Sequence, residues 1–504
     1  MDQPNVWKRL RALDADVTRL GHIAALLEWD QETYLPEAAV EERAAQIALI
    51  VGLHHDRIVA PEWGELFAEL DNGAEVGADG DEVRAAFLRE ARKRWTKKTK
   101  VPRELVEDIA RESSLAQAAW AAARRNDDFS SFAPHLEKIV GLERAYAEAV
   151  APDADPYDTL LDEYEPGATG DEIASVFDEL GRGLSSLLGR IRSGREPESG
   201  FLDRSYPVAE QDAFGRSVQE FMGYDERRGR LDLSAHPFTT TLGPDDVRVT
   251  TRYDEDNVLS GLFSNIHEAG HGLYEQGMGD ELRASLLADG ASLGIHESQS
   301  RFWENFVGRS RAFWDRWFPD FQCRFTENLK GVDAAGFFKA VNRVRPSLIR
   351  VDADEVTYSF HIIIRFRLER DLIHGRLAVG DLPEAWRTAY RDLLGITPPN
   401  DATGALQDVH WSVGLFGYFP TYALGNLYAA QFTQVMEQDL GPLDERIRNG
   451  DAGSILAWLR THIHAYGRVY PPGELCRRVT GGDLDPRCFL EYLELKYADV
   501  YEWG

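Results

Sequence analysis

The sequence has little cysteine and no long apolar run. Its 504 residues include three cysteines, Cys323, Cys476 and Cys488, which lie far apart and form no Cys-x-x-Cys pair. So few cysteines argue against a disulfide framework and indicate a reducing compartment. No apolar stretch reaches the roughly 18 residues of a membrane span, and the N-terminal residues lack the apolar segment of a secretory signal. We therefore expect a cytoplasmic protein that does not enter a membrane.

Positive charge is also scarce. Lysine and arginine together number 56 against 85 acidic residues, which gives a formal net charge of −29. A chain this acidic is repelled by phosphate backbones and by anionic lipid, so we expect neither nucleic acid nor a membrane surface as a partner. The basic run RKRWTKK, from Arg92 to Lys98, is interpreted as a solvated helix end rather than a nucleic-acid contact.

Apolar residues recur at three- and four-residue spacing through most of the chain, which predicts helices. The pattern changes once, between His236 and Tyr253, where two segments of period two flank a turn rich in Gly, Pro and Asp and predict a β-hairpin. We expect a mostly α-helical single domain over residues 1–504. Its expected parts are N-terminal helices over about 1–230, a metal-site region over about 231–430 and C-terminal helices over about 431–504.

The segment from Leu259 to Gly277 is the most informative for function. Its apolar residues share one helical face, and Gly277 predicts the helix end. His267 and His271 are four residues apart, so both imidazoles project from one face and can bind one ion. Glu268 can reach a water molecule at that ion, as the general base does in His-Glu-x-x-His zinc hydrolases. The alternative is a pair of histidines satisfied at a helix–helix contact.

A hydrolytic zinc site needs a third protein ligand and an open position for water. Glu297, in a helical segment 26 residues after His271, is the predicted ligand. The adjacent His296 would point about 100° away on a helix, so we interpret it as a pocket wall or as support for a ligand. Zn²⁺ is the expected ion, with Co²⁺ or another divalent ion as the alternative. Such a centre activates water and polarises a carbonyl, so peptide-bond hydrolysis is the predicted reaction.

Six motifs follow one another along the chain. They are HPF (236–238), DVRVT (246–250), HEAGH (267–271), HESQ (296–299), IRVDAD (349–354) and GALQDVHW (404–411). In this order they resemble the carboxypeptidase Taq family of zinc metallocarboxypeptidases. The resemblance implies a mostly helical, saddle-shaped subunit with a deep groove and a small sheet beside the metal-binding helix. It also implies a homodimer that removes single residues from the C-termini of peptides.

The resemblance further implies how the substrate carboxylate is bound. Arg350 matches the arginine expected to anchor the terminal carboxylate, and Arg248 is a second candidate, since a guanidinium suits bidentate capture of a carboxylate. For each arginine the alternative is a structural ion pair, with Asp352 or Asp354 as the partner of Arg350. His236 resembles a motif residue near the substrate groove, and its role stays open.

Three residues near the end of the motif series are assigned by the same resemblance. His410 and Tyr418 are the expected donors to the oxyanion of the tetrahedral intermediate. Tyr422 is assigned to substrate binding. Packing of a core helix is the alternative for both tyrosines.

One position departs from the pattern of many Glu-type zinc hydrolases, which place an aspartate four residues after the ligand glutamate to orient the first histidine. Here that position is Arg301. Another acceptor must therefore hold His267, because metal-binding histidines normally donate their second N–H. Two alternative functions stay open. One is a dipeptidyl carboxypeptidase or endo-oligopeptidase with the same zinc site, and the other is a non-catalytic zinc-binding scaffold.

Overall fold

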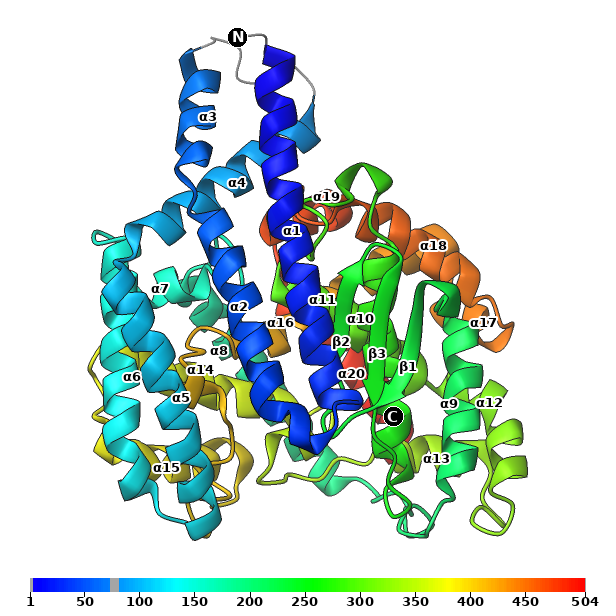
Figure 1. Ribbon diagram of the computed structural model, residues 1–504. Coiled ribbons are helices and arrows are strands. Elements are labelled where there is room, and N and C mark those ends of the chain that lie inside the picture. The colour runs from blue at the N-terminus through cyan, green and yellow to red at the C-terminus, as the bar shows by residue number, and fades with distance from the viewer. Residues whose placement is uncertain (1–2, 73–80, 504) are drawn as a thin grey trace.

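The computed structural model describes residues 3–72 and 81–503. Most of these residues lie in helices, and one small sheet lies among them (Figure 1). In the described ranges, no helix combines the length and the apolar character that crossing a membrane requires. The prediction of a mostly α-helical chain with one small sheet is confirmed.

The helices are joined by mostly short connections. The α-helices are α1 (Gln3–Thr33), α2 (Val40–Ile58), α3 (Pro61–Asn72), α4 (Glu82–Lys100), α5 (Arg103–Asn126), α6 (Phe129–Val150), α7 (Pro156–Leu161), α8 (Gly170–Ser193), α9 (Val208–Met222), α10 (Val258–Gln276), α11 (Leu293–Arg301), α12 (Arg311–Arg324), α13 (Ala334–Val341), α14 (Tyr358–Ile373), α15 (Leu382–Leu394), α16 (Pro420–Leu440), α17 (Leu443–Arg448), α18 (Ala452–His462), α19 (Pro472–Thr480) and α20 (Pro486–Tyr501). The 3₁₀ turns include η5 (Arg350–Asp352) and η7 (His410–Val413), and η4 (Phe302–Gly308) is π-helical.

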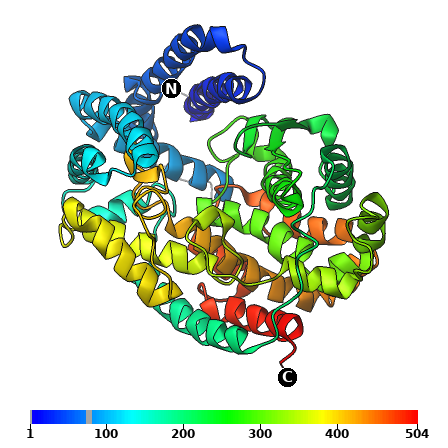
Figure 2. The same cartoon turned by 90° about the horizontal axis from the view of Figure 1, so that it is seen from below.

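The second helix lies largely outside the core, whereas the first contributes Leu10, Leu13 and Val17 to it. α1 and α2 form a long pair that crosses the front of the molecule in Figure 1, and Figure 2 shows this pair on the side opposite α20. Ile58 is the one buried residue found on α2. The core lies instead around α10, α11, α14 and α16, whose residues are largely buried.

The sheet covers one side of α10. Its strands are β1 (Gly229–Leu233), β2 (Thr239–Gly243) and β3 (Asp246–Thr251). β3 is central, with β2 antiparallel and β1 parallel to it. The predicted hairpin is confirmed as β2 and β3. β1 was not predicted: it is as short as β2, but it pairs with β3 in parallel, so no turn sequence joins it to its partner as one joins β2 to β3.

Two glycines let the central helices approach closely. A Cβ atom on Gly270 of α10 would lie 2.7 Å from the Cα atom of Ser300 at α11. A Cβ atom on Gly425 of α16 would lie 2.5 Å from Cγ of Glu297. Both distances are shorter than carbon atoms can approach, so only glycine permits this packing. α11 is therefore held tightly between α10 and α16.

Candidate metal centre

Two imidazoles from α10 and one carboxylate from α11 converge. The Nε2 atoms of His267 and His271 lie 3.7 and 3.5 Å from Oε2 of Glu297. One donor atom from each of the three residues lies within 4.8 Å of the other two. Donors bound to a tetrahedral zinc ion at about 2 Å lie about 3.3 Å apart, so this donor set fits such an ion with one position left for water. The structure thus brings together the three residues predicted as ligands.

Side-chain caps fix where the two ligand helices begin. The Asn257 side chain accepts the N–H of Ser260 at the start of α10. At the start of α11, Oγ of Ser292 accepts the N–H of Ile295 at 2.9 Å. Such caps satisfy backbone donors that a helix leaves free at its first turn. The observed α10 agrees with the helix predicted from Leu259 to Gly277.

Glu304 is the residue that holds His267. Its Oε2 atom lies 2.9 Å from Nδ1 of His267, which leaves Nε2 directed at the other ligands. Glu304 belongs to η4, the π-helical continuation of α11. Sequence reasoning missed it because only the position four residues after Glu297 was tested. A second acidic residue two helical turns after the ligand was the signal that could have identified it.

Arg301 joins the two carboxylates. Its Nε donates to Oε1 of Glu297 at 2.7 Å, and its Nη1 donates to Oε2 of Glu304 at 3.0 Å. Oε1 of Glu297 is thus held by the guanidinium, while Oε2 faces the imidazoles. Burial alone would raise the pKa of Glu297, but the charges of Arg301 and His267 and the contact with His271 together outweigh it, and the pKa lies well below its usual value. The ligand carboxylate is therefore ionised, as metal binding requires.

His296 supports the second ligand histidine. Its Nδ1 lies 2.6 Å from Nδ1 of His271, and its Nε2 lies 2.8 Å from Oε1 of Glu275. Because Nε2 of His271 faces the ligand cluster, its Nδ1–H is the donor, and His296 accepts it while donating Nε2–H to Glu275. Burial lowers the pKa of His271 to about 3, so its imidazole is neutral.

The sheet positions Glu268. Oγ1 of Thr239, on β2, donates to Oε2 of Glu268 at 2.7 Å. Burial raises the pKa of Glu268 above its ordinary value. A carboxylate with a raised pKa accepts protons more readily, which suits a general base.

Arg350 lies in a buried cluster of three charges. Its Nε donates to Oδ1 of Asp408 at 3.0 Å, and Nε of Arg365 donates to Oδ2 of the same carboxylate at 2.7 Å. The alternative pairing of Arg350 with Asp352 or Asp354 is wrong, because Asp408 is the partner. Two guanidinium groups share one carboxylate, so the cluster carries a surplus positive charge.

His410 and Tyr418, assigned to the oxyanion, and Tyr422, assigned to substrate binding, lie together near Arg350. The guanidinium carbon of Arg350 is 4.9 Å from the ring centre of Tyr422, whose Oη lies 3.3 Å from Nε2 of His410. The rings of His410 and Tyr418 are 5.4 Å apart. Burial, with the charge of Arg350, lowers the pKa of His410 to about 4, so this imidazole is neutral near pH 7. Burial and the charge of Glu297 raise the pKa of Tyr418, which stays a protonated donor.

Arg248 and His236 belong to the sheet region, on β3 and in the connection before β2. Arg248 donates twice to Asp246, at 2.8 Å each, and its guanidinium carbon lies 4.2 Å from the ring centre of Trp29. His236 is exposed in the connection between β1 and β2. Among the residues that the structure describes, neither side chain is found bonded to Arg350 or to a predicted metal ligand. Their part in substrate binding stays a prediction.

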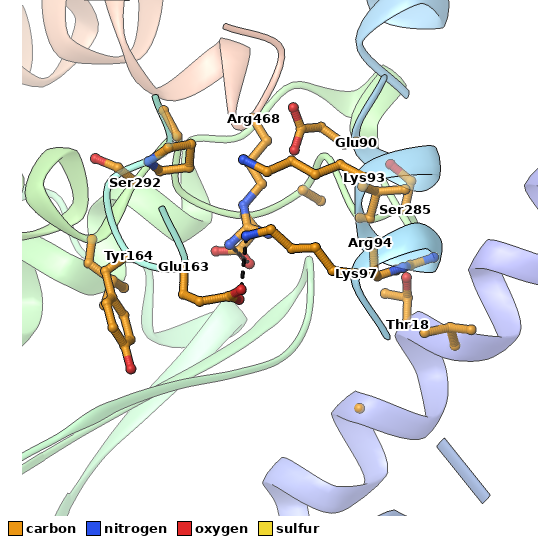
Figure 3. Close-up of a pocket in the computed structure, with 18 of the residues that line it drawn as sticks. Thr18, Glu90, Lys93, Arg94, Lys97, Glu163, Tyr164, Ser285, Ser292 and Arg468 are labelled. Carbon is orange, nitrogen blue, oxygen red and sulfur yellow. Dashed lines mark hydrogen bonds and ion pairs between the residues drawn. The ribbon is translucent and has the colours of Figure 1, made fainter. Parts of the chain in front are cut away.

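A cavity of about 400 Å³ adjoins this site, between α1, α4 and the start of α11. Lys93, Lys97 and Arg468 project into it (Figure 3). Lys97 binds Glu163 at 2.8 Å. Tyr164 lines the cavity and packs its ring 5.2 Å from that of Tyr418, so the cavity adjoins the cluster around Arg350. Part of the basic run predicted as a solvated helix end thus faces a cavity, although the run does form the last turns of α4.

Comparison with known proteins gives consistent matches over the whole chain. A family model described as carboxypeptidase Taq (M32) metallopeptidase matches residues 9–497. The chain is 45% identical to thermostable carboxypeptidase 1 of Thermus thermophilus, over 98% of this chain and 99% of the relative. It is 37% identical to carboxypeptidase 1 of Bacillus subtilis, over 96% of each. The crystal structure of the M32 carboxypeptidase from Deinococcus radiodurans R1 superposes with a TM-score of 0.95 at 41% identity, over 99% of this chain and all of that one.

Proposed function

The chain belongs to the carboxypeptidase Taq (M32) metallopeptidase family and is a carboxypeptidase, and we propose that it uses zinc to remove single residues from the C-termini of peptides. His267, His271 and Glu297 would hold the ion. Glu268 would act as general base, and Arg350 would bind the terminal carboxylate. Co²⁺ or another divalent ion would fit the same donors.

One observation carries this proposal. A buried arginine cluster with surplus positive charge lies beside His410 and Tyr422, and Tyr422 belongs to α16, which packs against the helix of Glu297. A guanidinium in such surroundings favours a carboxylate, and a substrate C-terminus supplies one. A metallocarboxypeptidase needs residues that bind a metal ion and a cation that binds the substrate carboxylate. The three donor residues would meet the first requirement, and Arg350 would meet the second.

The chemistry follows from the position of each group. A bound zinc ion supplies an activated water molecule and polarises the carbonyl of the scissile peptide bond. Glu268 accepts a proton from the attacking water and transfers it to the departing amine. His410 and Tyr418 donate hydrogen bonds to the oxyanion that develops on that carbonyl. Arg350 orients the substrate by its terminal carboxylate, which fixes the bond to be cut.

The substitution Glu268→Gln tests the assignment of the base. It keeps the size of the side chain and the contact with Thr239 but removes the proton acceptor. We expect peptide hydrolysis to fall at least about 10³-fold, while the zinc content measured by atomic absorption stays at one ion per chain. Thr240→Ser, on the same strand, serves as a control that changes a hydroxyl side chain without contacting Glu268. An unchanged rate in Glu268→Gln would refute the mechanism.

Peptides with a free C-terminus are the proposed substrates. The homodimer and the cytoplasmic location that the sequence suggests stay predictions, and analytical ultracentrifugation tests the first of them.

A further inference from the structure

We propose that Tyr358 sets the distance between the metal centre and the carboxylate anchor, so that one substrate residue fits between them and two do not. The inference rests on the proposed function, because it takes Arg350 as the anchor. It makes Tyr358 a specificity-determining residue that acts by positioning Arg350.

Tyr358 contacts the anchor directly. It is the first residue of α14 and is buried, with 6% of its surface exposed. Its hydroxyl oxygen accepts a hydrogen bond from Nη1 of Arg350 at 3.3 Å. Nε of Arg350 is held by Asp408. Two edges of the guanidinium are therefore fixed from different sides, which orients the group before a substrate arrives.

The same tyrosine contacts the residue that holds the metal ligand. The guanidinium carbon of Arg301 lies 4.6 Å from the ring centre of Tyr358, within cation–π distance. Arg301 in turn donates to Oε1 of Glu297. A continuous series of contacts thus runs from the ligand carboxylate through one aromatic ring to the anchor.

The ring also separates two positive charges. Arg301 and Arg350 are both buried or nearly so, and each meets a different part of Tyr358, one its face and the other its hydroxyl. Two guanidinium groups at close range in a protein interior repel one another strongly. Without the ring, Asp408 would still hold Nε of Arg350, but repulsion from Arg301 would push the rest of the guanidinium away from the metal centre.

The backbone ties Tyr358 to the segment of Arg350. The N–H of Tyr358 donates to the carbonyl oxygen of Asp354 at 2.9 Å. The carboxylate of Asp354 accepts the N–H of Thr357 at 2.9 Å and the hydroxyl of the same residue at 2.8 Å. Asp354 belongs to the IRVDAD motif that also contains Arg350. Anchor and spacer are therefore held in one short, locally bonded unit.

The length of a peptide residue makes this distance decisive. One extended residue spans about 3.5 Å, so an anchor displaced by that amount accepts two residues beyond the scissile bond in place of one. A packed aromatic ring is rigid enough to prevent such a displacement, because buried side chains have little free volume around them.

The first experiment measures binding in the Glu268→Gln background, so that no peptide is hydrolysed. Affinities of one N-acylated pentapeptide, as free acid and as C-terminal amide, are compared with and without Tyr358→Phe. That change removes the hydroxyl and keeps the ring. We expect about tenfold weaker binding of the acid and less than about twofold change for the amide, since only the acid uses the oriented guanidinium. Tyr206→Phe is the matched control, since it removes another buried tyrosine hydroxyl, one that donates to the backbone carbonyl of Phe201 and contacts neither Arg350 nor Arg301.

The second experiment examines the products. Tyr358→Leu removes both the ring and the hydroxyl in the otherwise unchanged enzyme, and its zinc content shows whether the fold and metal site are retained. We expect free dipeptides from the C-terminus to appear in the mass spectrum beside free single amino acids. Equal weakening of acid and amide by Tyr358→Phe, or strictly single losses by zinc-loaded Tyr358→Leu, would overturn the inference and leave the proposed function intact. Paired losses by the unsubstituted enzyme would instead refute the proposed function.

Discussion

Two regions around the metal centre contain several cations and carboxylates, yet they differ in how these charges balance. In the cavity of Figure 3, Lys97 lies between the carboxylates of Asp162 and Glu163. In the neighbouring buried cluster, Arg350 and Arg365 share the single carboxylate of Asp408. A cation that is already paired with carboxylates of the protein attracts a further anion only weakly. The difference between the two regions indicates that surplus charge, rather than cavity size or the number of cations, favours the Arg350 cluster as the proposed anion site.

The two regions also differ in burial. Arg365 is fully buried and 8% of the Arg350 side chain is exposed, whereas 40% of the Arg468 side chain in the cavity is exposed. Water and salt screen exposed charges, so an interaction in the cavity is worth little. The same interaction in the buried cluster is several times stronger.

The largest expected effect is on the free energy of unfolding, which should depend on the buried cluster much more than on the cavity. Asp408→Asn leaves two buried guanidinium groups without a counter-charge, so we expect the free energy of unfolding to fall by about 4 kcal/mol. Asp162→Asn, which removes the carboxylate beside Lys93 and Lys97, should cost about 1 kcal/mol or less because these charges are partly exposed. Urea denaturation of both variants measures the difference. Equal losses would mean that the two regions do not differ as described.

The next effect separates them by activity. Arg350→Met removes the anchor. We expect kcat/KM for a free-acid peptide to fall roughly 150-fold, which corresponds to a loss of about 3 kcal/mol of transition-state stabilisation. Arg468→Gln in the cavity should change kcat/KM less than about threefold. Steady-state kinetics on one N-acylated peptide compares the two. A larger loss in Arg468→Gln than in Arg350→Met would place the anchor in the cavity.

The smallest effect concerns pH. Burial and the charge of Arg350 lower the pKa of His410 to about 4. Between pH 6.5 and 4, His410 is therefore protonated in the unfolded chain but mostly unprotonated in the folded chain. Stability is therefore lost as the pH falls through that window. His410 should account for about 1.5 kcal/mol of the loss between pH 6.5 and 5.

The measurement compares the unsubstituted protein with His410→Asn in urea at both pH values, because the difference between the two isolates this residue. His54→Asn on the cavity side should alter the pH dependence less, since the His54 side chain is only partly buried. An unchanged pH dependence in His410→Asn would contradict the low pKa.

Local spacing made part of this molecule predictable. Four residues on a helix place His267 and His271 on one face whatever surrounds them, and the period-two pattern after His236 predicted β2 and β3. The same kind of reasoning failed for Glu304, because the continuation of α11 is π-helical and the partner of His267 lies beyond the position that an α-helical rule tests.

The spacing of residues along the sequence could not predict contacts between distant segments. Asp408 lies 58 residues from Arg350, and nothing in either segment shows that they meet. The nearer acidic residues Asp352 and Asp354 were the natural candidates from sequence, yet they are not the partners. Tyr358 carried no signal either, since its importance depends on Arg301 and Arg350 approaching it from two sides.

The most direct test of the account is mass spectrometry of one N-acylated pentapeptide, offered as free acid and as C-terminal amide, with and without a zinc chelator. The account predicts loss of one residue at a time from the acid, much slower cleavage of the amide, and no cleavage of either after chelation until zinc is restored. Loss of two residues at a time, an internal cut, or equal rates for acid and amide would contradict the claim that a surplus positive charge at Arg350 fixes the bond that is cut.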